Sequence, residues 1–192
     1  MPSKRSADCE ASAGPAGPEP TQGTSGIPAL GEAELMAWVV EHGVAARLVV
    51  PGAPTPTVSA AAAALGVALD DIVKSLVFLV AGEPWLVIAA GEHRVRYPAL
   101  AAAWRISRRR VRLATPDEAL AHSGFPVGAM PPFGHRRPLR ALIDTRAAVP
   151  RRTVYAGGGS RDALLELQTD ELLRVTAAVS APLSDPDGGD RP

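Results

Sequence analysis

Hydrophobic residues recur at helical spacing in several stretches of the chain. Leu35, Met36, Val39 and Val40 predict a helix over residues 32–42 that closes at Gly43. Thr57, Thr115 and Thr169 are suited to cap the starts of further helices, since a threonine hydroxyl can accept a hydrogen bond from an exposed N–H of the first turn. The helices expected after the first one cover residues 58–65, 97–104, 116–123 and 169–179.

Between these helices lie short runs rich in β-branched residues. Residues 73–80 and 85–90 are the strongest, and Ala-Gly-Glu-Pro between them predicts a hairpin. Shorter strands are expected at residues 47–50, 111–113, 141–144, 153–156 and 164–168. Since both hairpins and crossovers occur, the fold class is α/β of the mixed α+β kind, a mixed β-sheet with flanking helices.

Composition divides the chain into one domain and two tails. Residues 1–30 are rich in Ala, Gly, Pro, Ser and Thr, and residues 181–192 are similar, so we expect disordered tails around a domain at 31–180. The single cysteine, Cys9, leaves no internal disulfide. No apolar run approaches 18 residues and no secretory signal is recognisable, so we expect no membrane partner and a cytoplasmic protein.

The charges are unevenly distributed, although the formal net charge is zero. Residues 35–161 contain 16 basic and 8 acidic side chains, a net charge of +8. A basic body favours a polyanionic partner such as nucleic acid. The alternative is a solvated arginine-rich surface.

Several common catalytic sites are not supported. His42, His93, His122 and His135 lack metal-ligand spacing, so we expect no metal and no cofactor. The glycines at 157–159 fit neither a dinucleotide fingerprint nor a P-loop. The acidic pairs stand where helices are expected to begin, and a helix dipole already explains them.

Lys74 is unusual because the chain has 18 arginines and only two lysines. It lies inside a β-prone apolar run, where a compact ammonium group can donate three hydrogen bonds and change its pKa. An ordinary strand lysine with an exposed head group is the alternative interpretation.

A loop at residues 125–138 is too dense in proline and glycine to be a simple connection. Its prolines stiffen the backbone and its glycines allow close approach, so it could direct main-chain groups at a ligand. Alternatively it is a structural turn with Phe125 and Phe133 packed inward.

Four motifs occur in order along the chain: Val-Lys-Ser-Leu-Val-Phe at 73–78, Gly-x-x-x-Pro at 128–132 followed by Phe-Gly-His, Leu-Ile-Asp at 142–144, and Ala-Gly-Gly-Gly at 156–159. This order resembles the YbaK family of aminoacyl-tRNA deacylases, which is related to the editing domain of bacterial prolyl-tRNA synthetase. The resemblance covers about residues 35–180. It implies a metal-independent trans-editing hydrolase for mischarged tRNA, most often tRNA(Pro) carrying Ala, Cys, Ser or Thr.

The resemblance also implies roles for particular residues. Lys74 would hold the terminal adenosine or its phosphate, and the backbone of the loop would bind the aminoacyl group and position water. The expected substrate-binding residues are Gly128, Ala129, Met130, Pro131, Pro132, Asp144, Gly157 and Gly158. Asp144 could equally line the pocket or anchor an arginine, and His135 is expected to be a hydrogen-bonding loop residue. Many relatives carry a second glycine where this chain has Ala129, so the amino-acid pocket is expected to differ.

Arginine clusters would contact the tRNA backbone in this interpretation, with Arg108, Arg109, Arg110, Arg136 and Arg137 as the expected RNA-binding residues. The partners would be mischarged tRNA and a prolyl-tRNA synthetase, with no role for DNA. Two rivals remain. One is a non-catalytic module that binds tRNA or a synthetase, and the other is a hydrolase of small aminoacyl esters with no RNA partner.

Overall fold

The computed structural model describes residues 28–185. The predicted N-terminal tail lies outside these residues except for 28–30, and so does the end of the chain from residue 186. The helices are α1 Glu32–Glu41, α2 Val58–Leu65, α3 Tyr97–Ala103, α4 Pro116–Ser123 and α5 Thr169–Thr176, with 3-10 turns η1 Leu69–Asp71 and η2 Arg108–Arg110. The strands are β1 Ala46–Val49, β2 Val73–Val80, β3 Glu83–Ala90, β4 Val111–Leu113, β5 Arg140–Asp144, β6 Thr153–Gly157, β7 Leu164–Gln168 and β8 Val179–Ala181.

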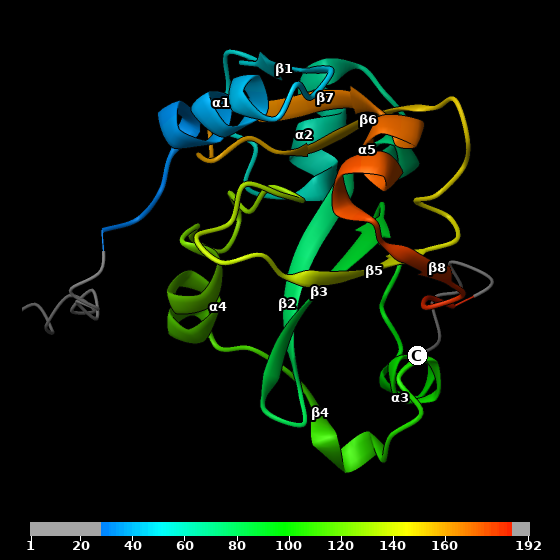
Figure 1. The fold of residues 1–192 in the computed structure, drawn as a ribbon. Coiled ribbons are helices and arrows are strands. Elements are labelled where there is room, and N and C mark those ends of the chain that lie inside the picture. Colours follow the sequence, from blue (N-terminus) through cyan, green and yellow to red (C-terminus); the bar gives the residue numbers. More distant parts are fainter. Residues whose placement is uncertain (1–27, 186–192) are drawn as a thin grey trace, which may run out of the picture.

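The strands form two sheets. The larger has the order β4-β2-β3-β5-β8, in which β2 pairs antiparallel with β3 and β4 while β5 runs parallel to β3 and β8. The smaller is antiparallel, with the order β1-β7-β6. The predicted mixed sheet with flanking helices is confirmed, and the chain adds a second sheet to it. Figure 1 shows α1 and the three-stranded sheet at one end of the molecule, with α3 and β4 at the other.

The hairpin between β2 and β3 is tighter than the sequence predicted. Its turn consists of Ala81 and Gly82, both with positive φ (56° and 94°), and Glu83 and Pro84 already belong to β3. Two left-handed residues suit the twist of a two-residue hairpin. Pro84 is tolerated because β5 first pairs with β3 at Trp85, so no β5 ladder bond is lost at the proline.

The predicted helix starts are confirmed for α2 and α4. The Thr57 hydroxyl accepts the N–H of Ala60 at 3.1 Å. In α4, the Glu118 N–H donates to the Thr115 hydroxyl at 3.3 Å, and the Thr115 N–H donates to the Glu118 carboxylate at 2.9 Å. This reciprocal pair is the capping box expected from the sequence.

The last helix was predicted incorrectly at both ends. Gln168, not Thr169, is the N-cap, and the Thr169 hydroxyl donates instead to the carbonyl of Arg152 at 2.9 Å. The helix ends at Thr176 because Ala177 adopts a left-handed conformation with φ 47°. The following residues form β8, which the sequence did not predict, because its pairing with β5 is long-range.

Structure continues past residue 180, where the domain was predicted to end. Leu183 is completely buried, and its carbonyl accepts the Arg96 N–H at 2.8 Å. Ser184 pairs with Val95 in an isolated bridge. The described part of the domain therefore extends to residue 185, and residues 181–185 cover one face of the larger sheet.

The two faces of the larger sheet bury different cores. On one face, alternate residues of β2 such as Val73 and Val77 join a core with α1, α5 and the 125–135 loop. On the other face, Phe78 and Val80 join a second core with Leu100 of α3. A third, small core lies where β2 begins, and it contains Ala61, Ala62, Ile72 and Leu164.

Candidate active site at the junction of β2 and β6

Lys74 lies near the start of β2, where it pairs with Ala89 of β3. It is half-buried, and its Nζ donates to the carbonyl oxygen of His93 at 2.8 Å. Burial lowers the pKa of Lys74 below its ordinary value, and the negative charge of Glu92 opposes that shift. A cation that is partly desolvated and only singly hydrogen-bonded retains donors for an anionic or polar ligand.

The peptide that holds Lys74 is itself fixed. The His93 ring Nε2 lies 2.9 Å from the Asp70 carboxylate at η1, and the Gly91 N–H donates to the Ile72 carbonyl at 2.8 Å. A Cβ added at Gly91 would stand 2.5 Å from the Asp70 carboxylate, so only glycine permits this close approach. No local sequence pattern indicates this supporting role of His93, because the contacts to Asp70 and Lys74 are long-range.

The loop between α4 and β5 has buried side chains and one exposed stretch of backbone. Phe125, Met130 and Phe133 are buried in the larger core, as the structural interpretation expected. Gly128, in contrast, is exposed and has φ +90°. The loop is therefore both a structural turn and a rigid support for a short exposed stretch of backbone.

His135 stabilises this loop from within. Its Nε2–H donates to the carbonyl of Pro131 at 3.0 Å. Burial lowers the pKa of His135 to about 4, with the Pro131 carbonyl opposing the shift. A neutral imidazole bonded to the backbone fits the hydrogen-bonding role that the sequence favoured over that of a base.

Gly157, the last residue of β6, and the two glycines that follow it fit tightly against neighbouring backbone. A Cβ at Gly157 would stand 2.3 Å from the carbonyl oxygen of Met130, and one at Gly158 would stand 2.7 Å from the Ala163 carbonyl. The Gly159 N–H donates to the Ala129 carbonyl at 3.0 Å. These contacts join the glycine segment directly to the Gly-x-x-x-Pro loop, as the predicted common site requires.

The strand pairing brings Lys74 to the same side as this loop. Ile72 and Tyr155 form a parallel bridge between the segments of β2 and β6, and both pack in or against the small third core. Since side chains alternate along a strand, Lys74 and Gly157, each two residues further on, point to that same side. The Met130 carbonyl lies against that side of Gly157, although the Met130 side chain packs in the core on the opposite face of β2. Within residues 28–185 the hydrogen bond of the Lys74 side chain goes to His93, and none joins it to the loop.

Two main-chain donors of the loop are unused. The N–H groups of Gly128 and Met130 donate to no acceptor in the described part of the chain, whereas the Ala129 N–H is taken by Pro126. Backbone N–H groups in a rigid loop can stabilise negative charge on a substrate oxygen. The arrangement therefore offers hydrogen-bond donors and one cation, without a side-chain nucleophile.

Asp144, at the end of β5, is a structural residue. Its side chain is buried, and its two oxygens accept the N–H of Arg146 at 2.9 Å and the N–H of Leu183 at 3.1 Å. It thus holds the C-terminal segment against the sheet. The two alternatives from the sequence are pocket lining and anchoring of an arginine; one contact to an arginine is through the backbone N–H of Arg146, and pocket lining stays a prediction.

The predicted RNA-binding arginines divide into two groups. Arg108 stacks on Tyr97 at 3.9 Å and donates to the Val111 carbonyl, and Arg136 donates to the Pro28 carbonyl. The side chains of Arg108 and Arg136 therefore already make contacts within the domain. Arg109, Arg110 and Arg137 are exposed, and none of the three forms an ion pair within residues 28–185.

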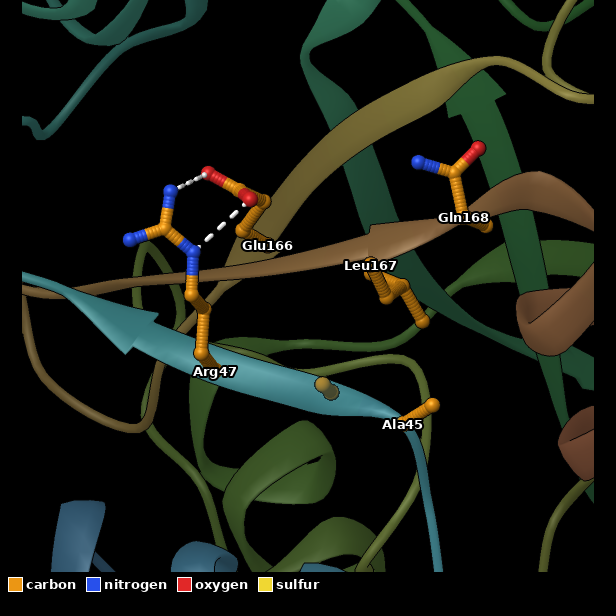
Figure 2. A pocket seen from close by; sticks show the side chains of 6 residues that line it. Ala45, Arg47, Glu166, Leu167 and Gln168 are labelled. Atoms are coloured by element: carbon orange, nitrogen blue, oxygen red, sulfur yellow. Dashed lines mark hydrogen bonds and ion pairs between the residues drawn. The ribbon is translucent and has the colours of Figure 1, made fainter.

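A separate hollow lies at the edge of the smaller sheet (Figure 2). It is lined by Ala45, Ala46, Arg47, Glu166, Leu167 and Gln168. Arg47 and Glu166 form a two-bonded ion pair there, with distances of 2.7 and 2.8 Å. Because its cation is neutralised within the protein, this hollow offers less to an anionic ligand than the junction of β2 and β6.

Among residues 28–185, no three His, Cys, Asp or Glu side chains gather closely enough to hold a metal ion. Nor does any helix in that range have the length and apolar character needed to cross a membrane.

Residues 52–175 match the sequence model of the aminoacyl-tRNA editing domain. The match covers more than half of the chain, and the chain therefore belongs to this family. YwhH of Bacillus subtilis, a protein without a characterised function, is 32% identical over 122 residues, which span 60% of this chain and 72% of YwhH. A proline–tRNA ligase of Nitratidesulfovibrio vulgaris is 34% identical over 95 residues, 48% of this chain and only 16% of the ligase.

Solved structures agree with this assignment. A candidate trans-editing enzyme for prolyl tRNA synthetase superposes with a TM-score of 0.73 at 31% identity, covering 80% of this chain and 96% of that one. The hypothetical protein APE2540 gives a TM-score of 0.72 at 34% identity, covering 79% and 99%. The fold and the relation to prolyl-tRNA synthetase editing domains are thereby established.

Proposed function

We propose that this protein is a trans-editing deacylase, which hydrolyses the ester between a tRNA and a wrongly attached amino acid. The proposed substrates are tRNA(Pro) molecules carrying Ala, Cys, Ser or Thr, and the proposed place of action is the cytoplasm. The membership of the editing-domain family supports the reaction class. The observation that carries the proposal is the placement of Lys74 on the same side of the β2–β6 junction as the Met130 carbonyl and Gly157.

In the proposed reaction, water adds to the ester carbonyl carbon and the bond to the ribose oxygen breaks. The ribose oxygen takes up a proton, and a free amino acid leaves. Lys74 holds the terminal adenosine or its phosphate, and the unused N–H groups of Gly128 and Met130 stabilise the developing oxyanion. An aminoacyl ester is already activated, so positioning of ester and water can suffice.

The amino-acid pocket would be formed by the loop from Gly128 to Pro132. Ala129 is fully buried and its carbonyl is bonded to Gly159, so this part of the loop has little freedom to widen. Met130, Pro131 and Pro132 are also buried. Because one methylene changes binding by only about 1–3 kcal/mol, the shape of this loop decides which amino acid is removed.

Arg109, Arg110 and Arg137 are the proposed contacts to the tRNA backbone, since they are exposed and free of ion pairs within residues 28–185. A prolyl-tRNA synthetase is a second proposed partner, because it releases the mischarged tRNA. The similarity to one such ligase covers only 16% of the length of that ligase, in keeping with a separate editing unit that works beside it.

A deacylation panel tests the function. Purified protein, in buffer with and without EDTA, is incubated with Ala-, Cys-, Ser-, Thr- and Pro-tRNA(Pro), and the remaining ester is measured over time. We expect metal-independent hydrolysis of at least one mischarged tRNA and sparing of Pro-tRNA(Pro). Tight tRNA binding without turnover would favour the non-catalytic module, and equal turnover of an aminoacyl-adenosine would favour the small-ester hydrolase.

A further inference from the structure

Arg161 lies at the exposed end of the candidate site, in the connection between β6 and β7. Its guanidinium Nε is 3.7 Å from the position that a Cβ would take at Gly128. Gly128 is the first residue of the Gly-x-x-x-Pro loop, and one of its neighbours, Ala129, is bonded to Gly159. An arginine side chain therefore lies over the outer edge of the loop that would bind the aminoacyl group.

The backbone that carries Arg161 is held from two sides. The N–H and the hydroxyl of Thr55 both donate to the Arg161 carbonyl, at 2.9 and 3.1 Å, and Thr55 is only 6% exposed. On the other side, the Ser160 hydroxyl bonds the carboxylate of Glu32 in α1. The position of the side chain is thus fixed at its root, while its guanidinium remains exposed.

The guanidinium of Arg161 has no hydrogen-bonded or ionic partner within residues 28–185. Three other exposed arginines are neutralised, Arg47 by Glu166, Arg112 by Glu118 and Arg174 by Glu171, whereas Arg109, Arg110 and Arg137 are unpaired within residues 28–185. The adjacent acid, Asp162, has its N–H bonded to Ser160, but no ion pair links it to Arg161. An exposed, unpaired guanidinium on a fixed backbone is suited to bind a phosphate, to which it can donate two parallel hydrogen bonds.

We propose that Arg161 binds a phosphodiester of the 3′-terminal nucleotides of the tRNA and thereby directs the aminoacyl ester to the loop at Gly128. The inference rests on the proposed function, because an aminoacylated tRNA carries its ester next to the phosphodiesters of its 3′ end. Arg161 is a substrate-binding residue in this account, and Lys74 lies on the inner side of the same site.

The test compares two substrates that carry the same ester: the aminoacyl-tRNA that the wild-type protein hydrolyses fastest, and the matching 3′-aminoacyl-adenosine, which has no phosphate. The variants are Arg161→Ala, Arg161→Lys and, as a matched loss of one arginine, Arg47→Ala. We expect Arg161→Ala to lower kcat/KM on the tRNA about tenfold, mainly through KM, and to leave the nucleoside substrate unchanged. The slope of log KM against log salt concentration should fall by about 0.7, the value for one phosphate contact on a single strand.

Arg161→Lys should recover part of the lost affinity, and Arg47→Ala should behave as the wild type. Equal losses on both substrates, or no loss on either, would overturn the proposal for Arg161. If the wild-type protein hydrolyses neither substrate, the proposed function fails instead. Binding of uncharged tRNA(Pro) then still decides the contact: weaker binding by Arg161→Ala supports it, and an unchanged Kd overturns it.

Discussion

Gly157 lies so close to Met130 that a methyl group on its α-carbon would stand 2.3 Å from the Met130 carbonyl oxygen. This contact joins the end of β6 to the loop that begins at Gly128. It also explains why a glycine is required there although the backbone of Gly157 has no positive φ. The shape of the proposed pocket therefore depends on the absence of a side chain.

Gly157→Ala should displace the loop and reduce deacylation at least tenfold, with a loss of about 1–3 kcal/mol in the free energy of unfolding because the added carbon overpacks the contact. Gly31→Ala adds the same methyl group where it meets only the Glu34 carboxylate at 3.5 Å, an ordinary contact. Urea unfolding and kcat/KM measured on both variants test this. Equal activity in the two variants would contradict the role of the contact.

Lys74 should give the activity an alkaline limit. Burial lowers the pKa of Lys74, so its charged form is lost below the pH at which an ordinary lysine loses its proton. Activity that requires the ammonium group should then fall as the pH rises through this lowered pKa. The pH profile of kcat/KM should show that fall, and Lys74→Ala should lack the pH-dependent activity altogether.

Glu92 provides a second check on the same limit. Its negative charge raises the pKa of Lys74, so Glu92→Gln should move the alkaline fall to lower pH. Glu83→Gln removes the same charge at the hairpin turn and should leave the profile where it was. A profile that is identical in wild type and Glu92→Gln would mean that Lys74 does not control the limit.

His135 should make stability depend on pH. Its pKa is lowered to about 4 in the folded state, so the unfolded chain binds a proton more readily between about pH 6.5 and 4. The contribution of neutral His135 to the free energy of unfolding is fully present above pH 6.5. It is lost as the pH falls through this range, by about 3 kcal/mol at most. His135→Gln, which can still donate to Pro131, should lose less stability than the wild type between pH 7 and 4 in urea titrations.

The arginines at η2 should contribute to RNA affinity without affecting the chemistry. We expect the double variant Arg109→Ala/Arg110→Ala to raise KM for aminoacyl-tRNA and to weaken its salt dependence, with kcat unchanged. Arg112→Ala is the control, since its guanidinium is already paired with Glu118. A double variant with the KM and salt dependence of the wild type would mean that this surface is merely solvated.

Helix starts could be predicted from the sequence because they depend on residues close together in the chain. Thr57 and Thr115 predict the starts of their helices because each capping hydroxyl and the N–H that it accepts lie only three residues apart. In contrast, β8 depends on pairing with β5 from far along the chain, and its Val179 is largely exposed, so no local pattern marks it. The position of the Lys74 ammonium group could not be predicted either, because it is hydrogen-bonded to a backbone carbonyl nineteen residues away.

Asp144 and Arg161 also show that the role of a single residue is hard to predict from sequence: the sequence singled out Asp144 as a site candidate and did not single out Arg161. Asp144 ends an apolar strand, and in the folded chain its carboxylate accepts the backbone N–H of Leu183, a residue of the predicted tail. Arg161 looked like one arginine among many, and only the folded chain places it beside Gly128. Residue type and order indicate the reaction class, whereas the roles of single residues depend on long-range contacts.

The central claim is that Lys74 and the Gly128–Pro132 loop form a deacylase site. The most direct measurement is the rate of ester loss from mischarged tRNA(Pro), with wild-type protein and the Lys74→Ala variant at equal concentration, after circular dichroism has shown that both are folded. We expect the wild type to hydrolyse at least one of Ala-, Cys-, Ser- or Thr-tRNA(Pro) and the Lys74→Ala variant to lose that activity. Survival of every mischarged tRNA at high enzyme concentration, or equal rates for the two proteins, would contradict the central claim.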